Sequence, residues 1–323
     1  MKKKALKTIV VLLGISAIAF LVHQVGWDDI RETMGLVGWG YLLILTYPLL
    51  WIFPNTLGWR SAIRHHENIP FWTLVQIRLS GEVFNSLLPS GYVGGEPIKA
   101  QLLSRFISLR EATSSVLIAK ATQSVVFLVY LGLGVTLFMP AGSSRFIEKS
   151  AYGALMLLGL GIITFVILLS QRSFTKLSSI LFRLTRMQWF VHKAPQFSAL
   201  DESLGSFYRE GRSRFFASMA WHGVAWIAGA LELTMILALM GHPVSWHEAW
   251  FMSAVAQLAT TIGLMVPAGV GLYEGGHYMA AIALGLPPAV GLSAALIRRI
   301  REAFWNIIGV LIFMRIERLS PRK

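Results

Sequence analysis

The sequence contains no cysteine, and only 14% of its 323 residues are charged. Without cysteine the chain forms no disulfide bond and offers neither a thiolate nucleophile nor a cysteine-ligated metal site. The low charge content argues against a soluble protein, in which about a quarter of the residues are normally charged. The surface of this chain is therefore expected to face something other than water.

Apolar residues make up 55% of the chain and are grouped into long runs. Because a helix needs about 20 mostly apolar residues to cross the hydrocarbon core, such runs predict membrane spans. We expect full spans at 5–23, 38–58, 111–139, 151–170 and 213–240, and a sixth span with charges inside it at 289–314. No clear small-x-small cleavage site follows the first run, so a retained helix is favoured there over a secretory signal. The expected fold is an all-α polytopic integral membrane protein with a single transmembrane domain over 1–323.

The net charge of +13 would suggest a nucleic-acid partner in a soluble domain, but in a membrane protein the position of each cation matters more. With the N-terminus in the cytoplasm, only Arg31, Arg145 and Lys149 fall outside. Five cations remain at membrane depth, namely Arg78, Lys120, Arg298, Arg299 and Arg301. The positive-inside rule then predicts a multi-pass protein of a bacterial cytoplasmic (inner) membrane with both termini cytoplasmic, and no nucleic-acid partner.

Residues 172–214 form the one sizeable polar segment. Arg183 and Arg186 alternate there with Leu, Phe and Trp, as in a helix that lies at a membrane interface. A solvated basic linker explains the composition equally well, and the sequence leaves both readings open.

Two segments, 71–106 and 246–286, are interrupted by Gly and Pro before a span is complete. A constant offset of 178 residues aligns Pro89 with Pro267, Glu96 with Glu274, and Lys120 with Arg298. The same offset aligns the flanking spans, which predicts repeat 1 at about 35–139, a linker and extra span at about 140–212, and repeat 2 at about 213–315. The charge distribution runs the two copies in opposite directions across the membrane, as in inverted-topology transporters.

Each interrupted segment predicts a re-entrant helix pair, in addition to the six spans. Non-helical backbone at membrane depth must be enclosed by protein or by a polar cavity, because hydrocarbon cannot pair its N–H and C=O groups. The loops SGYVGGEPIK and PAGVGLYEGG are therefore expected inside the bundle, with glycines that permit a tight reversal and the close approach of a ligand. The alternative is a structural kink packed on a neighbouring helix.

Ionised side chains at membrane depth are costly and normally face a cavity or a counter-ion. Helical spacing places Arg298, Arg301 and Glu302 on one face, with Arg299 about a quarter-turn away and free to lie against another helix. A phosphate headgroup would satisfy Lys120 and Arg298 together with the loop N–H groups. The alternative is closed ion pairing, of Arg298 with Glu302 or Glu274 and of Lys120 with Glu96.

Other polar and aromatic residues carry weaker signals. Glu82 and Asn85 could line the mouth of the first loop or cap its helix. Glu232 and His222 are interpreted as satisfied groups of the bundle interior rather than ligands. Interfacial anchoring is the expected role of three tryptophans, Trp51, Trp246 and Trp250.

At the two loops the sequence resembles the flippase-like transmembrane domain family of lysylphosphatidylglycerol synthases. The first family motif corresponds to Asn85, Pro89, Gly94, Gly95, Glu96 and Lys99, and the second to Pro267, Ala268, Gly269, Val270, Gly271 and Glu274. The arginine that follows each motif in the family falls on Lys120 and Arg298. The stretch from 273 to 309 is most similar to the hopanoid-associated branch. Departures are Ala268 in place of a glycine, Lys120 in place of arginine, and Glu96 where aspartate is common.

The resemblance implies an all-helical fold and the movement of lipid between leaflets. We therefore expect a lipid flippase-type transporter for a phosphate-bearing lipid, either a phospholipid or a polyprenyl phosphate, with no cofactor and no enzyme activity. A homo-oligomer is possible. The residues expected to bind or gate the headgroup are Lys120, Arg298, Arg301, Glu96, Glu274, Lys99, Asn85, Gly94, Gly95, Pro89, Pro267, Gly269 and Gly271. An integral-membrane enzyme acting on lipid phosphate and a lipid-binding scaffold or regulator are the alternatives.

Overall fold

The computed structural model describes residues 20–64, 66–87, 94–140, 145–170, 173–262, 266 and 269–318. This part of the chain is helical and contains no strand. The elements are α2 (Trp27–Gly35), α3 (Gly40–Thr46), α4 (Leu49–Ala62), η1 (His66–Asn68), α5 (Phe71–Leu87), α6 (Glu96–Leu103), α7 (Leu109–Thr136), α8 (Arg145–Ser170), α9 (Ser173–Thr185), α10 (Gln188–Glu210), α11 (Arg212–Leu239), α12 (Trp246–Ile262), α13 (Leu272–Ala283) and α14 (Pro288–Arg318). The predicted fold class, an all-α polytopic membrane protein, is confirmed.

Four segments of the described chain are long and apolar enough to cross a membrane: Gly40–Ala62, Leu109–Thr136, Glu148–Ile167 and Arg212–Leu239. They coincide with four of the predicted spans. The first of them is built from α3 and α4, with a break before Pro48. The predicted span 5–23 lies almost wholly outside the described residues. The predicted span 289–314 is α14, a continuous helix of 31 residues that carries four charged groups near its middle.

Helix starts follow from local sequence. The Ser108 hydroxyl accepts a hydrogen bond from the Glu111 backbone N–H at 3.2 Å and caps α7, satisfying one of the free donors of its first turn. Pro288 occupies the first position of α14, where its missing N–H costs nothing. α13 begins after Gly271, whose φ of 84° is a conformation that side-chain-bearing residues rarely adopt.

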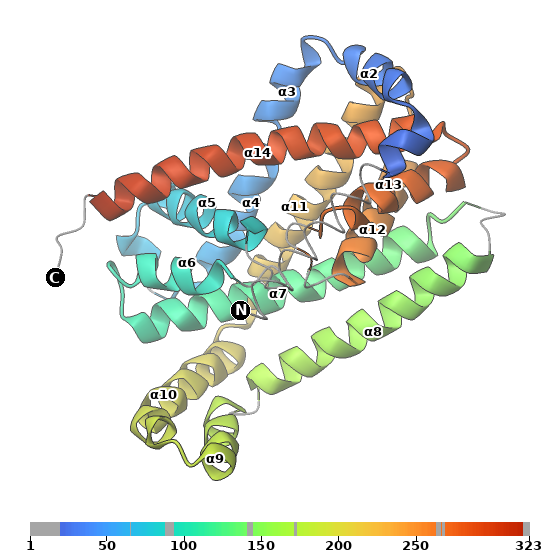
Figure 1. Ribbon diagram of the computed structural model, residues 1–323. Coiled ribbons are helices and arrows are strands. Elements are labelled where there is room, and N and C mark those ends of the chain that lie inside the picture. The colour runs from blue at the N-terminus through green and yellow to red at the C-terminus, as the bar shows by residue number, and fades with distance from the viewer. Residues whose placement is uncertain are drawn as a thin grey trace.

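The order of elements from α4 to α7 is repeated from α11 to α14. α5 and α12 each contain 17 residues, and each is followed by a short helix, α6 or α13, and then by a long one, α7 or α14. The long helices α7 and α14 run in opposite directions, with α5 and α6 under one end of α14 and α12 and α13 under the other (Figure 1).

Packing between the two halves is reciprocal. α4 packs along α11, the corresponding helix of the other half, whereas α5 packs on α14 and α12 packs on α7. Each half therefore completes the core of the other. Buried small residues at these contacts, such as Gly309 against the Leu79 carbonyl and Gly134 against Ala254, let the helix backbones approach closely.

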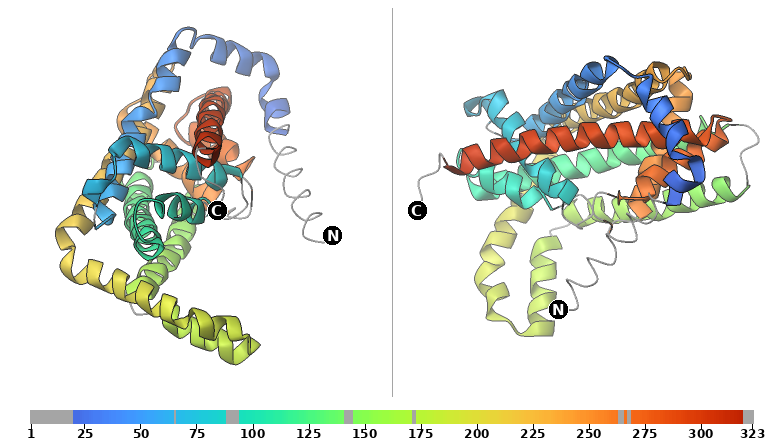
Figure 2. Two further views of the ribbon diagram at one scale, coloured as in Figure 1. Left: turned by 90° about the vertical axis from the view of Figure 1, so that its left-hand side faces the viewer. Right: turned by 45° about the horizontal axis from the view of Figure 1, so that its top comes forward.

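Residues 173–210 form the helical hairpin α9–α10, which projects from the bundle (Figure 2). The Asp201 carboxylate fastens the hairpin by accepting hydrogen bonds from the Thr175 backbone N–H at 2.8 Å and hydroxyl at 2.6 Å. Ile180 and Leu184 are exposed on α9, beside the exposed Arg183. Exposed apolar and basic side chains on one short helix are the features that an interfacial position requires.

Candidate functional site

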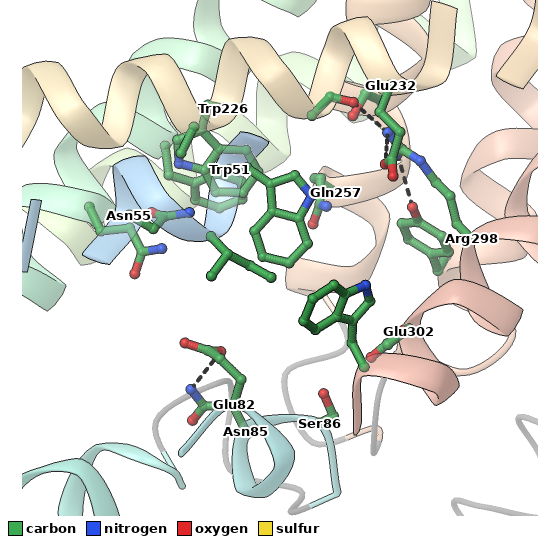
Figure 3. A pocket seen from close by; sticks show the side chains of 18 of the residues that line it. Trp51, Asn55, Glu82, Asn85, Ser86, Trp226, Glu232, Gln257, Arg298 and Glu302 are labelled. Carbon is green, nitrogen blue, oxygen red and sulfur yellow. Dashed lines mark hydrogen bonds and ion pairs between the residues drawn. The ribbon is translucent and has the colours of Figure 1, made fainter. Parts of the chain in front are cut away.

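The two halves enclose a cavity of about 440 Å³. Six pairs of its lining residues are separated by 178 positions: Trp51 and Gly229, Leu79 and Gln257, Lys120 and Arg298, Gln123 and Arg301, Ser124 and Glu302, Phe127 and Trp305. Equivalent positions of the two halves therefore face one shared space. Figure 3 shows Glu82 and Asn85 on one side of this cavity and Glu232 and Arg298 on the other, with Trp51 between them.

The lining carries more positive than negative charge. Its cations are Arg78, Lys120, Arg298, Arg299 and Arg301, and its carboxylates are Glu82, Glu232 and Glu302. An excess of two cationic groups in a low-dielectric enclosure favours the entry of an anion, because the charges are poorly screened there.

Three helices of the first half converge on a polar cluster at one side of the cavity. The Lys99 ammonium, which is nearly fully buried, donates to Glu82 at 2.8 Å and to Glu96 at 3.2 Å. The Asn85 amide donates to both carboxylates, at 3.1 and 3.3 Å. Lys120 Nζ lies 3.8 Å from Glu96. The predicted pair Lys120–Glu96 is therefore present, while Lys99 satisfies Glu96 more closely.

Gly95 holds this cluster together by close backbone packing. Its N–H donates to the Asn85 side-chain oxygen at 2.7 Å. A Cβ built on Gly95 would lie 1.9 Å from the Gly81 carbonyl oxygen, so no larger residue fits between α5 and α6. The backbone at Gly95 has a φ of −84°, which is open to most residues. Its role is the close approach of two helices, whereas we expected a tight reversal and close contact with a ligand.

The second half presents its charges from α11, α13 and α14. Arg298 Nη2 lies 3.3 Å from the Glu232 carboxylate, and Arg298 Nη1 donates to the Tyr273 hydroxyl at 3.1 Å. Arg301 donates to the same oxygen of Glu232. Glu232 is 1% exposed and lines the cavity. The expectation that Arg298 pairs with Glu302 or Glu274 is wrong, because the carboxylate in contact with Arg298 belongs to Glu232 of α11.

Arg299 contacts another helix and also faces the cavity. It lines the cavity and donates to Glu274 at 2.7 Å and to Glu302 at 3.1 Å. The other Glu274 oxygen accepts from the Gly271 N–H at 2.7 Å, so Glu274 caps α13 and links it to α14. The expectation that Arg299 lies against another helix is therefore met, since Glu274 belongs to α13.

Three N–H groups of the cavity-lining arginines are left without a hydrogen bond. Arg78 Nε, Arg298 Nε and Arg299 Nη2 are buried and have no hydrogen-bond partner among the described residues. The same holds for Glu232 Oε1. Buried polar groups of a native protein are normally satisfied, so these four atoms are exceptions within residues that line the cavity. The guanidinium groups of the lining as a whole are suited to the oxygens of an anionic ligand.

Of the predicted site residues, Asn85, Lys120, Arg298 and Arg301 line the cavity. Glu96, Lys99 and Glu274 stand behind it as ion-pair partners. Gly94, Gly95, Gly269 and Gly271 lie in the turns before α6 and α13 and are not part of the lining. Pro89 and Pro267 lie outside the described residues.

Sequence reasoning missed most of the lining, including Arg78, Glu232, Tyr273 and Trp51. Trp51 was expected at the membrane interface. Trp250, also expected there, is buried and stacks on Tyr130 with ring centroids 5.1 Å apart; Trp246 is 45% exposed. Arg78 and Glu232 could have been found from their charge at membrane depth, but their partners lie on other helices.

His222 meets its expected description as a bundle-interior group. Its ring is 1% exposed, and Nδ1 lies 2.8 Å from the Asn55 side-chain oxygen. A Cβ on Gly58 would lie 2.9 Å from the His222 ring. His222 thus helps to fix α4 against α11, and only its partner Asn55 lines the large cavity.

Comparisons with known proteins agree with this architecture. A UPF0104 membrane protein of Methanothermobacter thermautotrophicus is 23% identical over 93% of this chain and 91% of its own length. Another, of Pyrococcus horikoshii, is 21% identical over 97% of this chain and 98% of its own length. No solved structure matches. The family described as the lysylphosphatidylglycerol synthase TM region matches residues 7–309, and the chain belongs to this family.

Proposed function

We propose that this protein is a flippase-type transporter that moves a phosphate-bearing lipid between the leaflets of a bacterial cytoplasmic membrane. The observation that carries the proposal is the excess of cations lining one cavity, with Lys120 and Arg298 at equivalent positions of the two halves. A phosphate would supply oxygen acceptors for the N–H groups of these cations.

The lipid-facing surface supports a path in which only the headgroup enters the protein. On α8, Met156, Leu157 and Leu160 are 76%, 73% and 65% exposed, as is suitable for contact with acyl or prenyl chains. The cavity, in contrast, is lined by charges from both halves. The headgroup would pass through the cavity while the tail stays in hydrocarbon. The charged headgroup then avoids hydrocarbon, and the apolar tail avoids the polar cavity.

The bound headgroup must compete with internal carboxylates. Glu232 accepts from Arg298 and Arg301, which makes it the internal anion that a phosphate would displace. On the other side, the Lys120 side chain is 21% exposed, against 5% for Arg298, so Lys120 is the more accessible of the two equivalent cations. We infer that the phosphate first meets Lys120 and then exchanges with Glu232 at the arginines.

Alternating access would use the repeated architecture. The helix pairs α5–α6 and α12–α13 lie at opposite ends of α14 (Figure 1). The first helix of each pair packs on the long helix of the other half, and the second packs on the long helix of its own half. Small rocking of one half against the other would open the cavity first to one leaflet and then to the other. In this proposal both termini are cytoplasmic.

Reconstitution into vesicles tests the proposal against its rivals. Purified protein is incorporated into liposomes that contain fluorescent short-chain phospholipid in both leaflets, and dithionite is added to bleach the outer leaflet. A transporter makes nearly all of the probe accessible, whereas protein-free vesicles leave about half protected. Chemical conversion of a labelled lipid, seen by mass spectrometry, would indicate an enzyme instead. Binding without movement or conversion would indicate a scaffold.

A further inference from the structure

The cavity contains polar groups that the charged residues do not explain. The side-chain amides of Gln123, Gln257 and Asn306 line it and have no hydrogen bond to another described residue. An amide offers both donors and an acceptor, so this set is suited to neutral groups that donate and accept at once.

Aromatic rings form the remaining wall. Trp51, Phe127, Trp226 and Trp305 all line the cavity, and Trp226 stacks on Phe127 with ring centroids 4.7 Å apart. Trp51 occupies the middle of the site, between the two charged sides (Figure 3). The electron-rich face of an indole attracts the weakly positive C–H groups of a polyol or sugar, while the hydroxyls of the same ligand reach sideways to polar groups.

The amides, unlike Lys120 and Arg298, do not follow the repeat. Lys120 and Arg298 stand at equivalent positions, but Gln257 is equivalent to Leu79 and Gln123 is equivalent to Arg301. The neutral polar groups are thus not a by-product of the repeat. A bare phosphate needs cations and N–H donors only, and would leave the three amides without partners.

We propose that the lipid headgroup contains a polyol or a sugar that is esterified to the phosphate. This inference rests on the proposed function. The phosphate binds among Lys120, Arg298 and Arg301, and the hydroxyls bind the side-chain amides of Gln257 and Asn306. The volume of about 440 Å³ lies in the range of about 300–1,000 Å³ that small-molecule sites occupy. Discrimination follows because a headgroup without hydroxyls leaves polar groups of the site unpaired.

Binding to the purified full-length protein in detergent tests the inference without requiring transport. The probes are phosphatidylinositol, a glucosyl-phosphoryl polyprenol and, as the lipid without hydroxyls, phosphatidic acid with the same chains as the phosphatidylinositol. We expect at least one hydroxylated probe to bind more tightly than phosphatidic acid. Tighter binding of the phosphatidylinositol indicates a phospholipid source, and tighter binding of the glucosyl lipid indicates a polyprenyl source.

Two variants locate the preference. Gln257→Leu copies the residue of the equivalent position, and Asn306→Leu removes a second amide. Each should weaken binding of the preferred lipid by roughly threefold to tenfold, the effect of one neutral hydrogen bond, and leave phosphatidic acid unchanged. Gln101→Leu, an exposed amide on α6, is the matched control.

Two results would overturn the inference while leaving lipid transport intact: equal affinity for all three probes, or an equal loss of phosphatidic acid binding in the amide variants. A proposed function that fails gives a different pattern, in which the vesicle assay shows no movement of any probe. A preference for hydroxylated lipid that the variants abolish supports the inference whether or not the vesicle assay shows movement.

Discussion

Lys120 and Arg298 occupy equivalent positions on α7 and α14 and face the same cavity, yet they are neutralised differently. Lys120 Nζ lies 3.8 Å from Glu96, which Lys99 also contacts, whereas Arg298 Nη2 lies 3.3 Å from Glu232, which Arg301 also contacts. Glu232 has no counterpart in the first half, where Pro54 stands at the equivalent position. The two equivalent cations therefore face carboxylates from different helices, α6 for Lys120 and α11 for Arg298.

Removing the charge of Glu232 should strengthen lipid binding. In Glu232→Gln the two arginines lose their internal anion, so a phosphate no longer has to displace it. We expect affinity for an anionic lipid to rise by roughly tenfold, as for a charged hydrogen bond that no longer competes. Translocation should slow because release becomes harder. Titration of lipid into the purified protein gives the affinity, and weaker binding by Glu232→Gln would refute the displacement step.

A methyl group at Gly95 should destabilise the protein through packing. The added Cβ of Gly95→Ala would meet the Gly81 carbonyl oxygen at 1.9 Å, so α6 must shift away from α5, at a cost of about 1–3 kcal/mol. Thermal unfolding in detergent measures the effect. Gly161→Ala on α8 is the control, because nothing lies within 4 Å of its Cβ; equal melting temperatures of the two variants would contradict the packing account.

The orientation of α8 can be tested with single cysteines, because the natural chain has none. Arg145 lies at the start of α8, and Ser179 lies in α9, which follows the end of α8. Both residues are exposed. Arg145→Cys should react with an impermeant maleimide from the outside, and Ser179→Cys only after the membrane is opened. Labelling of both cysteines from the same side would show that Glu148–Ile167 does not cross the membrane. The inverted orientation of the two halves would then be refuted as well.

The sequence predicts the local features of this protein well, because span length and helix punctuation are local signals. The offset between Lys120 and Arg298 also follows from sequence, and both residues line the cavity. Glu232 could not be assigned to Arg298, since the contact depends on how α11 lies against α14. Trp51 could not be placed either, because a tryptophan in an apolar run looks the same at an interface and at a cavity wall.

Glycines show the same limit. Gly95 was recognisable as a special position, but whether it approaches a ligand or another helix depends on the packing of α5. Gly159, which sequence places on a lipid-facing span, is buried with its Cβ position 3.7 Å from Leu128. A helix sequence gives the spacing of residues around its axis, whereas the rotation of the helix against its neighbours is set by tertiary contacts.

The most direct test of headgroup capture compares lipid translocation by Lys120→Ala and Arg298→Ala with that of the wild type, in vesicles with equal amounts of protein. Neither change leaves a carboxylate without a partner, because Lys99 still contacts Glu96 and Arg301 still contacts Glu232, so both variants should fold. We predict that both lose translocation while Lys120→Arg, which keeps the charge, retains it. Wild-type rates in either alanine variant would contradict capture of the phosphate at that position.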